Sequence, residues 1–520
     1  MDIKLHDSLA DSFRWRCKES ANSTAIKFLD REQTYAELDS NSNLIAQGLL
    51  ELGIKPDSRI AYLAKNTDYF FEIFYGSLKA RAVVVGVNYR LAAEEVAYVL
   101  ENSNSEILFV SPEFFEIIDQ ISDRLSSIKK IICLEGEHKD WTTYLDWKGS
   151  SKDIDPHLSS NKDDDVVQLY TSGTTGHPKG VQITNKNFYA VTDSTIGTIP
   201  FPYGSKVMVC MPVYHVAGTN FGIWGLLQGC TNVIIPEVDP GLILDLVEKE
   251  KIELTLWVPA VILFLLQHPN SAKTDFSSLK VVVYGASPIA EDTLMNAIDL
   301  MKCGFYQVYG LTETSGAITC LVAEDHDPKK DKLRSCGKAL PGVDIKVIDE
   351  NGKEVNQGDV GEIITRSDLN MKGYWNNPDA TEASIQNGWF YSGDAGFVDE
   401  EGFLYIHDRV KDMIVSGGEN IYPAEVENAL MSNEEILDAA VVGVPDKKWG
   451  ESTKAFVVLS PGSSLNDKDI ISYTKTKIAS YKCPTSVEFI EALPRNPSGK
   501  VLRRELRAPY WEGQDRGVSG

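Results

Sequence analysis

Hydrophobic positions in the first third of the chain switch between two spacings. Residues 35–52 carry apolar side chains three or four positions apart, which predicts a helix, whereas the run Arg59-Ile60-Ala61-Tyr62-Leu63 predicts a strand. Residues 70–82 predict a second helix that runs into the apolar triplet Val83-Val84-Val85. Because strands that alternate with helices are typical of βαβ units, we expect layered α/β structure in this part of the chain.

The same alternation returns after residue 165. Apolar runs at 166–170, 207–209, 232–235 and 281–284 predict buried strands, and helix-length segments separate them. Two such stretches in one long chain predict two sheets. We therefore expect the α/β fold class, with a large N-terminal domain built from two layered α/β sheets.

A different pattern begins at Gly342. Short alternating strands are separated by turn signals such as the one at 349–352, which predicts a small β-rich subdomain. Further along, Pro423 begins a helical pattern that is followed by two strand signals, and these predict a compact α+β unit. We expect a large N-terminal domain at 1–408 and a small, mobile C-terminal α+β domain at 409–520.

Composition narrows the class of protein. The 520 residues carry a formal net charge of −24 with a pI near 4.8, which argues against a nucleic-acid-binding surface because phosphate recognition needs clustered basic residues. The eight cysteines form no CxxC pair, which argues against structural zinc and fits a reducing cytoplasm. Anionic substrates must therefore meet positive charge that is local to their site.

The pattern contains no segment that predicts membrane insertion. Residues 1–19 are interrupted by charges and lack the continuous apolar run that signals export. The longest apolar stretch, 254–266, is shorter than the ~20 residues that a spanning helix needs, and it contains Pro259. We expect a cytoplasmic protein without a transmembrane segment; a weak peripheral membrane contact and a homodimer stay open.

The sharpest local motif directly follows the strand predicted at 166–170. It reads Thr171-Ser172-Gly173-Thr174-Thr175-Gly176-His177-Pro178-Lys179-Gly180. Glycines let a backbone approach a polyphosphate closely, N–H groups and hydroxyls can donate to its oxygens, and Lys179 adds a positive charge. This chemistry indicates a site for the β- and γ-phosphates of a nucleotide.

The phosphate motif is not a Walker A loop. That loop needs glycine before its lysine and Ser or Thr after it, whereas Pro178 and Gly180 stand at these positions. The next residues, Val181-Gln182-Ile183, predict a strand rather than a helix. We therefore expect a hairpin that holds the phosphates from one side.

The phosphate loop and four later motifs resemble motifs of the adenylate-forming (ANL) superfamily. This superfamily includes acyl-CoA synthetases, peptide-synthetase adenylation domains and luciferases. The later motifs keep the superfamily's order and cover nearly the whole chain. They are Tyr309-Gly310-Leu311-Thr312-Glu313-Thr314, Tyr391-Ser392-Gly393-Asp394, Asp408-Arg409-Val410-Lys411-Asp412 and Pro494-Arg495-Asn496-Pro497-Ser498-Gly499-Lys500. The chain is identified as a member of the acyl-CoA synthetase and fatty acid–CoA ligase family.

The resemblance implies an ATP-dependent, AMP-forming acid–CoA ligase. In such an enzyme a carboxylic acid and ATP give an acyl-adenylate and pyrophosphate, and coenzyme A then takes the acyl group while AMP leaves. The substrates would be the acid, ATP and CoA, with Mg²⁺ as the metal ion. The 1–408 region would be the adenylation domain, and 409–520 would be a lid that carries the catalytic lysine and turns about a hinge residue.

The resemblance also assigns a role to each matched residue. The implied catalytic residues are Lys500, Thr312, Glu313 and His215, with Glu313 as the metal ligand and Lys411 as the hinge. The implied ATP contacts are Thr171, Ser172, Gly173, Thr174, Thr175, Gly176, Lys179, Gly285, Ala286, Ser287, Tyr309, Gly310, Thr312, Asp394, Arg409 and Lys500. The implied CoA contacts are Ser416, Gly417 and Gly418.

Apolar side chains favour an acid with an apolar chain. The expected acyl pocket contains Tyr214, His215, Phe221, Trp224 and Thr314. A medium- to long-chain fatty acid is the acid that we expect, and a short-chain or aryl acid stays open. A luciferase-like monooxygenase and a stand-alone adenylation enzyme that loads a carrier protein are the alternatives from other classes.

Overall fold

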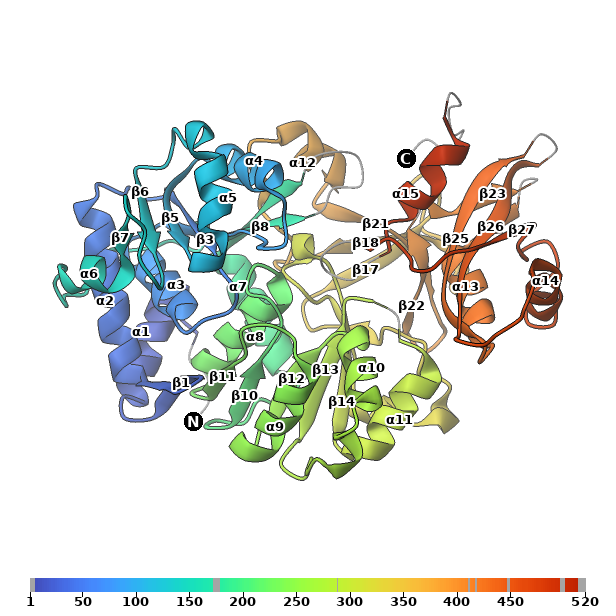
Figure 1. The fold of residues 1–520 in the computed structure, drawn as a ribbon, viewed down its shortest axis with the longest axis horizontal. Helices are drawn as coiled ribbons and strands as arrows, with labels where there is room; N and C mark the ends of the chain where they lie inside the picture. Colours follow the sequence, from blue (N-terminus) through green and yellow to red (C-terminus); the bar gives the residue numbers. More distant parts are fainter. Residues whose placement is uncertain are drawn as a thin grey trace. The chain divides into compact units, whose positions relative to one another are not determined.

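The computed structural model (Figure 1) describes residues 5–171, 178–287, 289–409, 412–416, 419–446, 449–495 and 501–512. Residues 407–409, 415, 419 and 420 are described by their backbone alone. Helices and strands alternate along most of the chain, so the predicted α/β class is confirmed. Among the described helices, none combines the length and the apolar character of a transmembrane span.

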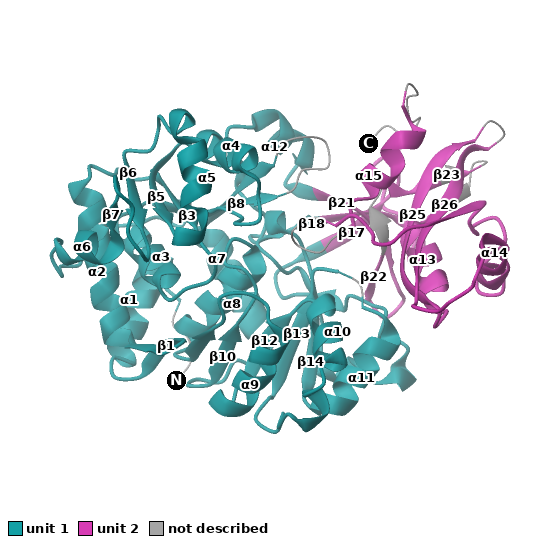
Figure 2. Ribbon diagram, viewed as in Figure 1, with its two compact units in different colours: residues 1–344, 365–390 teal, residues 345–364, 391–520 magenta. Residues whose placement is uncertain are grey.

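The chain groups into two compact units (Figure 2). Unit 1 consists of residues 1–344 and 365–390, and unit 2 consists of residues 345–364 and 391–520. The chain passes from one unit to the other within strands of a single sheet. The β-rich region therefore groups mostly with the C-terminal part of the chain. The boundary that we expected at residue 408 lies within unit 2, at the end of β22, and a division at that point stays a prediction.

The first sheet of unit 1 has a parallel centre and antiparallel edges. The strands from β14 to β1 pair in parallel, whereas β2, β15 and β16 add antiparallel strands at the two edges. In spatial order the strands are β16 (Lys338–Ala339), β15 (Thr319–Leu321), β14 (Gly304–Tyr309), β13 (Val281–Gly285), β12 (Leu254–Trp257), β10 (Lys206–Val209), β11 (Thr231–Ile234), β1 (Thr24–Phe28) and β2 (Arg31–Thr34).

The second sheet of unit 1 is parallel except at one edge. There β9 returns antiparallel to β8, and a short strand from much later in the chain, β19, pairs with β9. In spatial order the strands are β19 (Gly373–Tyr374), β9 (Lys179–Thr184), β8 (Asp165–Thr171), β4 (Val83–Gly86), β3 (Arg59–Leu63), β5 (Ser105–Val110), β6 (Lys130–Cys133) and β7 (Thr142–Thr143).

Helices of the two sheets pack on each other inside unit 1. α3 packs on β4 of the second sheet and α8 packs on β10 and β11 of the first. The two helices approach closely at Gly222, where an added Cβ would lie 2.4 Å from the Phe71 ring. Nearly every residue of both helices is buried, as expected for helices enclosed on all sides.

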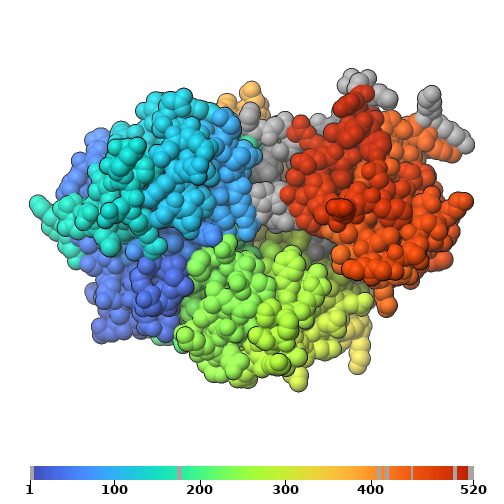
Figure 3. Space-filling model, viewed as in Figure 1, coloured from blue at the N-terminus to red at the C-terminus, as the bar shows by residue number. Residues whose placement is uncertain are grey.

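Other helices of unit 1 form its surface. On the face shown in Figure 3, α4 and α5 appear in blue to cyan and α9 to α11 in green to yellow. The helices of unit 1 are α1 (Leu9–Glu19), α2 (Tyr35–Glu51), α3 (Tyr69–Lys79), α4 (Ala93–Ser103), α5 (Phe115–Gln120), α6 (Tyr144–Gly149), α7 (Asn185–Ile196), α8 (Val216–Leu227), α9 (Pro240–Glu250), α10 (Pro259–Gln267), α11 (Glu291–Met301) and α12 (Pro378–Ser384).

Unit 2 contains most of one sheet and the whole of another. The first of these sheets has the order β17 (Asp344–Ile348), β18 (Gly361–Arg366), β21 (Trp389–Val398) and β20 (Ile385–Gln386), with β22 (Leu404–Arg409) also paired to β21. The other has the order β24 (Glu419–Ile421), β23 (Ile414–Ser416), β26 (Gly450–Leu459) and β25 (Ile436–Asp446), with β27 (Ser486–Phe489) on β26. Its helices are α13 (Pro423–Met431), α14 (Asp467–Lys475) and α15 (Arg503–Arg507).

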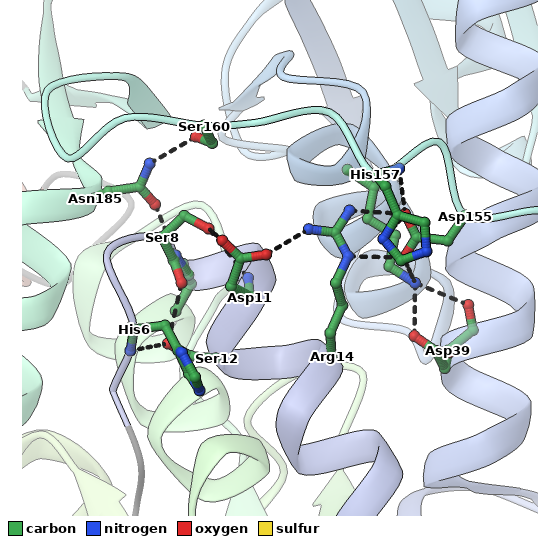
Figure 4. A network of polar contacts seen from close by, with 12 residues as sticks. His6, Ser8, Asp11, Ser12, Arg14, Asp39, Asp155, His157, Ser160 and Asn185 are labelled. Atoms are coloured by element: carbon green, nitrogen blue, oxygen red, sulfur yellow. Dashed lines mark hydrogen bonds and ion pairs between the residues drawn. The ribbon is translucent and has the colours of Figure 1, made fainter.

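A polar network fastens the segment before β8 to helices of unit 1 (Figure 4). Arg14 of α1 donates two hydrogen bonds to the Asp155 carboxylate, at 2.7 and 2.8 Å, and pairs with Asp11 at 2.8 Å. The buried Lys79 ammonium of α3 lies 3.8 Å from the Asp155 carboxylate and 2.6 Å from that of Asp39. Burial would raise the pKa of Asp155, but the hydrogen bonds and nearby cations outweigh it and lower this pKa to about 2.

We expect Asp155→Asn to lower the stability of unit 1 by about 2 kcal/mol at pH 7, because two cations lose a charged partner. The contribution of Asp155 is fully present above its unfolded pKa of about 3.9 and is lost as the pH falls through the folded pKa. Thermal denaturation of the variant and the parent at pH 7 and pH 3 measures this, and the difference between them should shrink at pH 3. If the stability difference between variant and parent is the same at pH 3 and pH 7, the ionised Asp155 carboxylate is not what stabilises unit 1. The exposed Asp140, changed to asparagine, is the control.

Candidate active site

Two predicted ATP-contact segments follow neighbouring parallel strands of the first sheet. β13 ends at Gly285 and β14 ends at Tyr309, and Gly285 lies beside Val308. A Cβ added to Gly285 would lie 2.1 Å from the Val308 carbonyl oxygen, so this close approach requires glycine. Ala286, with a φ of 68°, and Ser287 follow as exposed residues. Because ligands of open α/β sheets bind beyond the carboxyl ends of parallel strands, this edge is suited to a nucleotide.

The short turn η4 (Thr312–Thr314), which follows β14, places Glu313 in the protein interior. Thr314 is fully buried, and its hydroxyl oxygen accepts a backbone N–H within the turn at 2.9 Å. Next to it, Asn220 of α8 donates to the Ser315 carbonyl oxygen at 2.7 Å. These bonds fix the turn against α8, so the fold itself determines where the carboxylate lies.

The hairpin β8–β9 forms the base of the phosphate motif. Thr171 at the end of β8 pairs with Lys179 at the start of β9, and the predicted hairpin is confirmed. The Lys179 Nζ atom lies 4.3 Å from the centroid of the Tyr374 ring, and the Tyr374 hydroxyl donates to Glu313 Oε1 at 2.9 Å. The hairpin and the η4 turn therefore meet at one tyrosine. The predicted contacts Ser172, Gly173, Thr174, Thr175 and Gly176 lie outside the described residues.

His215 directly precedes α8, and its ring lies 4.4 Å from the ring of Tyr214. Burial, and then the charge of Arg90, lower the pKa of His215 to about 4, so the imidazole is neutral at pH 7. Its Nε2 atom is buried and has no hydrogen-bond partner within the described part of the chain. Because a buried polar atom needs a partner, this nitrogen is suited to contact a bound substrate.

Two predicted acyl-pocket residues pack inside unit 1. Trp224 of α8 donates through Nε1 to Thr192 Oγ1 of α7 at 3.0 Å. The Phe221 ring packs on Phe201 with centroids 5.3 Å apart. Both side chains therefore help to join α8 to its neighbours, and their place in the acyl pocket stays a prediction.

In unit 2, the predicted ribose contacts lie on paired strands. The backbone register of β21 and β22 places Asp394 opposite Arg409. The Asp394 N–H donates to Ser392 Oγ at 3.0 Å, and the Ser392 hydroxyl donates to the Ile363 carbonyl oxygen at 2.6 Å. Burial raises the pKa of the nearby Glu362 carboxyl, and the Asp394 charge adds to this rise. The two positions are thus side by side, and their contact with ribose stays a prediction.

The described residues on either side of Lys500 in its motif are bonded to each other. Arg495 and Val501 form an antiparallel bridge, and the Leu502 N–H donates to the Pro494 carbonyl oxygen at 2.8 Å. Of the CoA contacts, Ser416 ends β23. The predicted residues Lys411, Gly417, Gly418 and Lys500 lie outside the described residues.

Comparison with known proteins decides the family. Residues 13–375 match the family described as AMP-binding enzyme, and residues 425–500 match the AMP-binding enzyme C-terminal domain. The chain belongs to the AMP-binding enzyme family. The predicted adenylate-forming superfamily and the acyl-CoA synthetase assignment are confirmed, and the protein is an ATP-dependent, AMP-forming enzyme.

Relatives of this AMP-binding enzyme differ in their acids and acceptors. A fatty acid–[acyl-carrier-protein] ligase, ScoC, from Streptomyces coeruleorubidus is 37% identical, with 98% of each chain covered. The long-chain-fatty-acid–CoA ligase FadD13 from Mycobacterium tuberculosis is 36% identical over 92% of this chain and 94% of its own. A feruloyl-CoA synthase from Amycolatopsis is 35% identical over 95% and 97%.

A solved structure agrees with this family. ATP-bound MatB from Rhodopseudomonas palustris is 26% identical and superposes with a TM-score of 0.88 over 96% of this chain and 99% of that one. This likeness supports ATP binding by the present chain.

The AMP-binding enzyme also has a buried ionic network that the sequence motifs did not predict. The Arg59 guanidinium lies 2.9 Å from the Asp165 carboxylate, and both side chains are almost fully buried. Gln182 of β9 and Lys372 donate to the same carboxylate at 2.6 and 2.9 Å. Arg59 also stacks 3.5 Å above the Trp375 ring. The network ties the hairpin to the segment at 371–375. In the sequence, this segment is marked only by an aromatic pair that follows a glycine.

Proposed function

We propose that this enzyme joins a medium- to long-chain fatty acid to coenzyme A. A carboxylate oxygen of the acid attacks the α-phosphorus of ATP, and pyrophosphate leaves to give the acyl-adenylate. The deprotonated thiol of CoA then attacks the acyl carbonyl carbon, and AMP leaves. The observation that carries the first step is the contact of the phosphate hairpin with the buried Glu313 through Tyr374.

The proposed acid rests on the relatives and on the surroundings of His215. Two of the relatives are named for fatty acids, and one is named for the aryl acid ferulate. Tyr214 is 3% exposed beside His215 and provides an apolar ring there. Neutral His215 adds a polar nitrogen without adding charge, which suits a carboxylate that is being converted to an uncharged acyl group.

Glu313 fits a magnesium ion. Its carboxylate is buried and forms no ion pair with any residue that the structure describes. Mg²⁺ is usually held by one or two carboxylates and the substrate phosphates, and the described ranges contain no group of three His, Cys, Asp or Glu residues that could hold a metal by themselves. A bound Mg²⁺ would draw charge from the leaving pyrophosphate.

The other side chains would bind, align and release the substrates. Tyr309 would stack on adenine, Thr312 would donate to the α-phosphate and Lys179 would contact the terminal phosphates. Lys500 would neutralise the repulsion between the carboxylate and the α-phosphate. After adenylation, rotation of the lid about Lys411 would withdraw Lys500 and bring the CoA contacts Ser416, Gly417 and Gly418 to the adenylate.

A carrier protein is the second candidate acceptor, because the relative ScoC is named as an acyl-carrier-protein ligase. In that case the thiol of a phosphopantetheine arm would replace the thiol of CoA. Both acceptors present the same reactive group, so adenylation does not distinguish them. Mass spectrometry of the product with CoA and a phosphopantetheinylated carrier protein in competition would identify the acceptor.

A panel of acids tests the proposed substrate. We expect acid-dependent AMP release with CoA to rise steeply from butyrate to octanoate, by at least about 100-fold in kcat/KM, since each buried CH₂ contributes about 0.8 kcal/mol, or roughly fourfold. Acetate and ferulate should be poor substrates. Preference for ferulate would replace the fatty acid by an aryl acid, and formation of ADP instead of AMP would refute adenylation.

A further inference from the structure

A short segment at 371–375, which we call the strap, connects the two sides of the proposed ATP site. Its strand β19 pairs with β9, and the Trp375 N–H donates to the Gly180 carbonyl oxygen at 2.7 Å. At its other end, the Met371 N–H donates to the Glu313 carbonyl oxygen at 2.7 Å. The strap is therefore bonded to both the phosphate hairpin and the η4 turn.

Tyr374 on the strap contacts a charged group on each side. Its hydroxyl donates to Glu313 Oε1 at 2.9 Å, and Lys179 Nζ lies 4.3 Å from its ring centroid. A hydroxyl that donates to a carboxylate makes a charge-assisted bond, and an ammonium over a tyrosine face is attracted by the ring. A single side chain thus orients two groups of opposite charge.

Other residues of unit 1 form hydrogen bonds with the strap and hold Tyr374 in place. The Tyr374 N–H donates to Thr381 Oγ1 at 2.9 Å, and Lys372 Nζ donates to Asp165 Oδ1 at 2.9 Å. Tyr374 is only 7% exposed. Its ring is therefore confined by neighbouring structure before any ligand binds.

We propose that Tyr374 is a positioning residue for the metal and the phosphates. Its hydroxyl fixes one oxygen of Glu313, which keeps the carboxylate in a single orientation and leaves its other lone pairs for a cation. Its ring holds the ammonium of Lys179, which lies near the end of the phosphate motif. This inference rests on the metal role that we propose for Glu313. It has two parts: in the hydroxyl part the Tyr374 hydroxyl orients Glu313, and in the ring part the Tyr374 ring orients Lys179.

Tyr374→Phe tests the hydroxyl part. We expect the Mg²⁺ concentration for half-maximal binding of α,β-methylene-ATP to rise about 10-fold, because Glu313 loses a hydrogen bond to its charged form. Without Mg²⁺, the affinity for the analogue should change less than about twofold, since the ring under Lys179 is retained. Isothermal titration calorimetry at a series of Mg²⁺ concentrations measures both values without turnover.

Tyr374→Leu tests the ring part. This variant should show the same change in Mg²⁺ dependence and, in addition, about threefold weaker metal-free binding of the analogue, because Lys179 loses the aromatic face. If Tyr374→Phe and Tyr374→Leu bind the metal-free analogue equally, the ring part of the inference is wrong. Thermal denaturation shows whether each variant is folded under the conditions of the titration.

Two further variants separate the inference from its premise. Tyr306→Phe removes a hydroxyl from a tyrosine of β14 that is also 7% exposed, and it should leave the Mg²⁺ dependence unchanged. Glu313→Gln should raise the Mg²⁺ requirement, and Tyr374→Phe added to it should have no further effect. If Glu313→Gln shifts the requirement and Tyr374→Phe does not, only the inference fails. If Glu313→Gln has no effect, the metal role of Glu313 fails with it.

Discussion

Replacing Lys500 with alanine is expected to slow acyl-adenylate formation by about 10²–10³-fold, by analogy with the removal of one oxyanion donor. The first half-reaction joins two anions, the carboxylate and the α-phosphate, so it depends on a cation between them. The second half-reaction joins a thiolate to an uncharged acyl carbon. Transfer from preformed adenylate to CoA should therefore fall less than about threefold.

Ion pairs attach the described residues before and after Lys500 to other elements of unit 2. In unit 2, Arg495 pairs with Asp438 at 2.5 Å, and Arg503 pairs with Glu427 at 2.6 Å. These ion pairs attach both ends of the motif, before and after Lys500, to β25 and α13.

Rapid-quench measurement of pyrophosphate release and of thioester formation from synthetic adenylate separates the two half-reactions. Lys468→Ala is a suitable control, because this lysine is exposed at the start of α14 and should affect neither step. An equal loss in both half-reactions would contradict a lysine that acts only in adenylation.

Local pattern was sufficient to predict most elements. The strand predicted at 59–63 is β3, and the apolar run at 281–284 lies within β13. The helix predicted at 35–52 is α2, which ends one residue earlier. These elements have strong periodicity, and turn residues or caps bound them. The phosphate hairpin was predicted for the same reason, because glycines separate two apolar runs.

Contacts between distant segments could not be predicted in this way. The strand β19 is two residues long and pairs with β9, which lies far earlier in the chain, so it has no periodicity of its own. Tyr374 was missed because nothing in its neighbourhood shows that Glu313 and Lys179 meet it. The same holds for Arg59, which begins a predicted strand, because its partner Asp165 directly precedes a different predicted strand. The grouping of the β-rich region with unit 2 likewise depends on packing rather than on local pattern.

Asp165→Ala is expected to destabilise unit 1 by about 3–5 kcal/mol, because the buried Arg59 guanidinium loses its buried carboxylate partner. The two side chains are 2% and 1% exposed, so water cannot replace the lost partner. Arg59 keeps an ion pair with Asp57 at 2.8 Å, but the Asp57 side chain is 57% exposed, so this pair does not replace the buried one. Its contacts with Gln168 at 3.2 Å and with the Trp375 ring carry no negative charge. The strap loses its anchor at Lys372 in the same variant, so binding of an ATP analogue should weaken as well.

The neighbouring carboxylate provides a matched control. Asp164 pairs with Arg81 at 2.8 Å, but each side chain is 26% exposed, so Asp164→Ala should cost no more than about 1 kcal/mol. Urea denaturation at 0.05 and 0.5 M NaCl compares the two variants. Salt screens the exposed pair and hardly reaches the buried one, so only the cost of Asp164→Ala should decline at the higher salt concentration. Equal costs for the two variants would show that the exposed Asp57 is a sufficient counter-charge for Arg59, and that the buried pair adds little to the stability of unit 1.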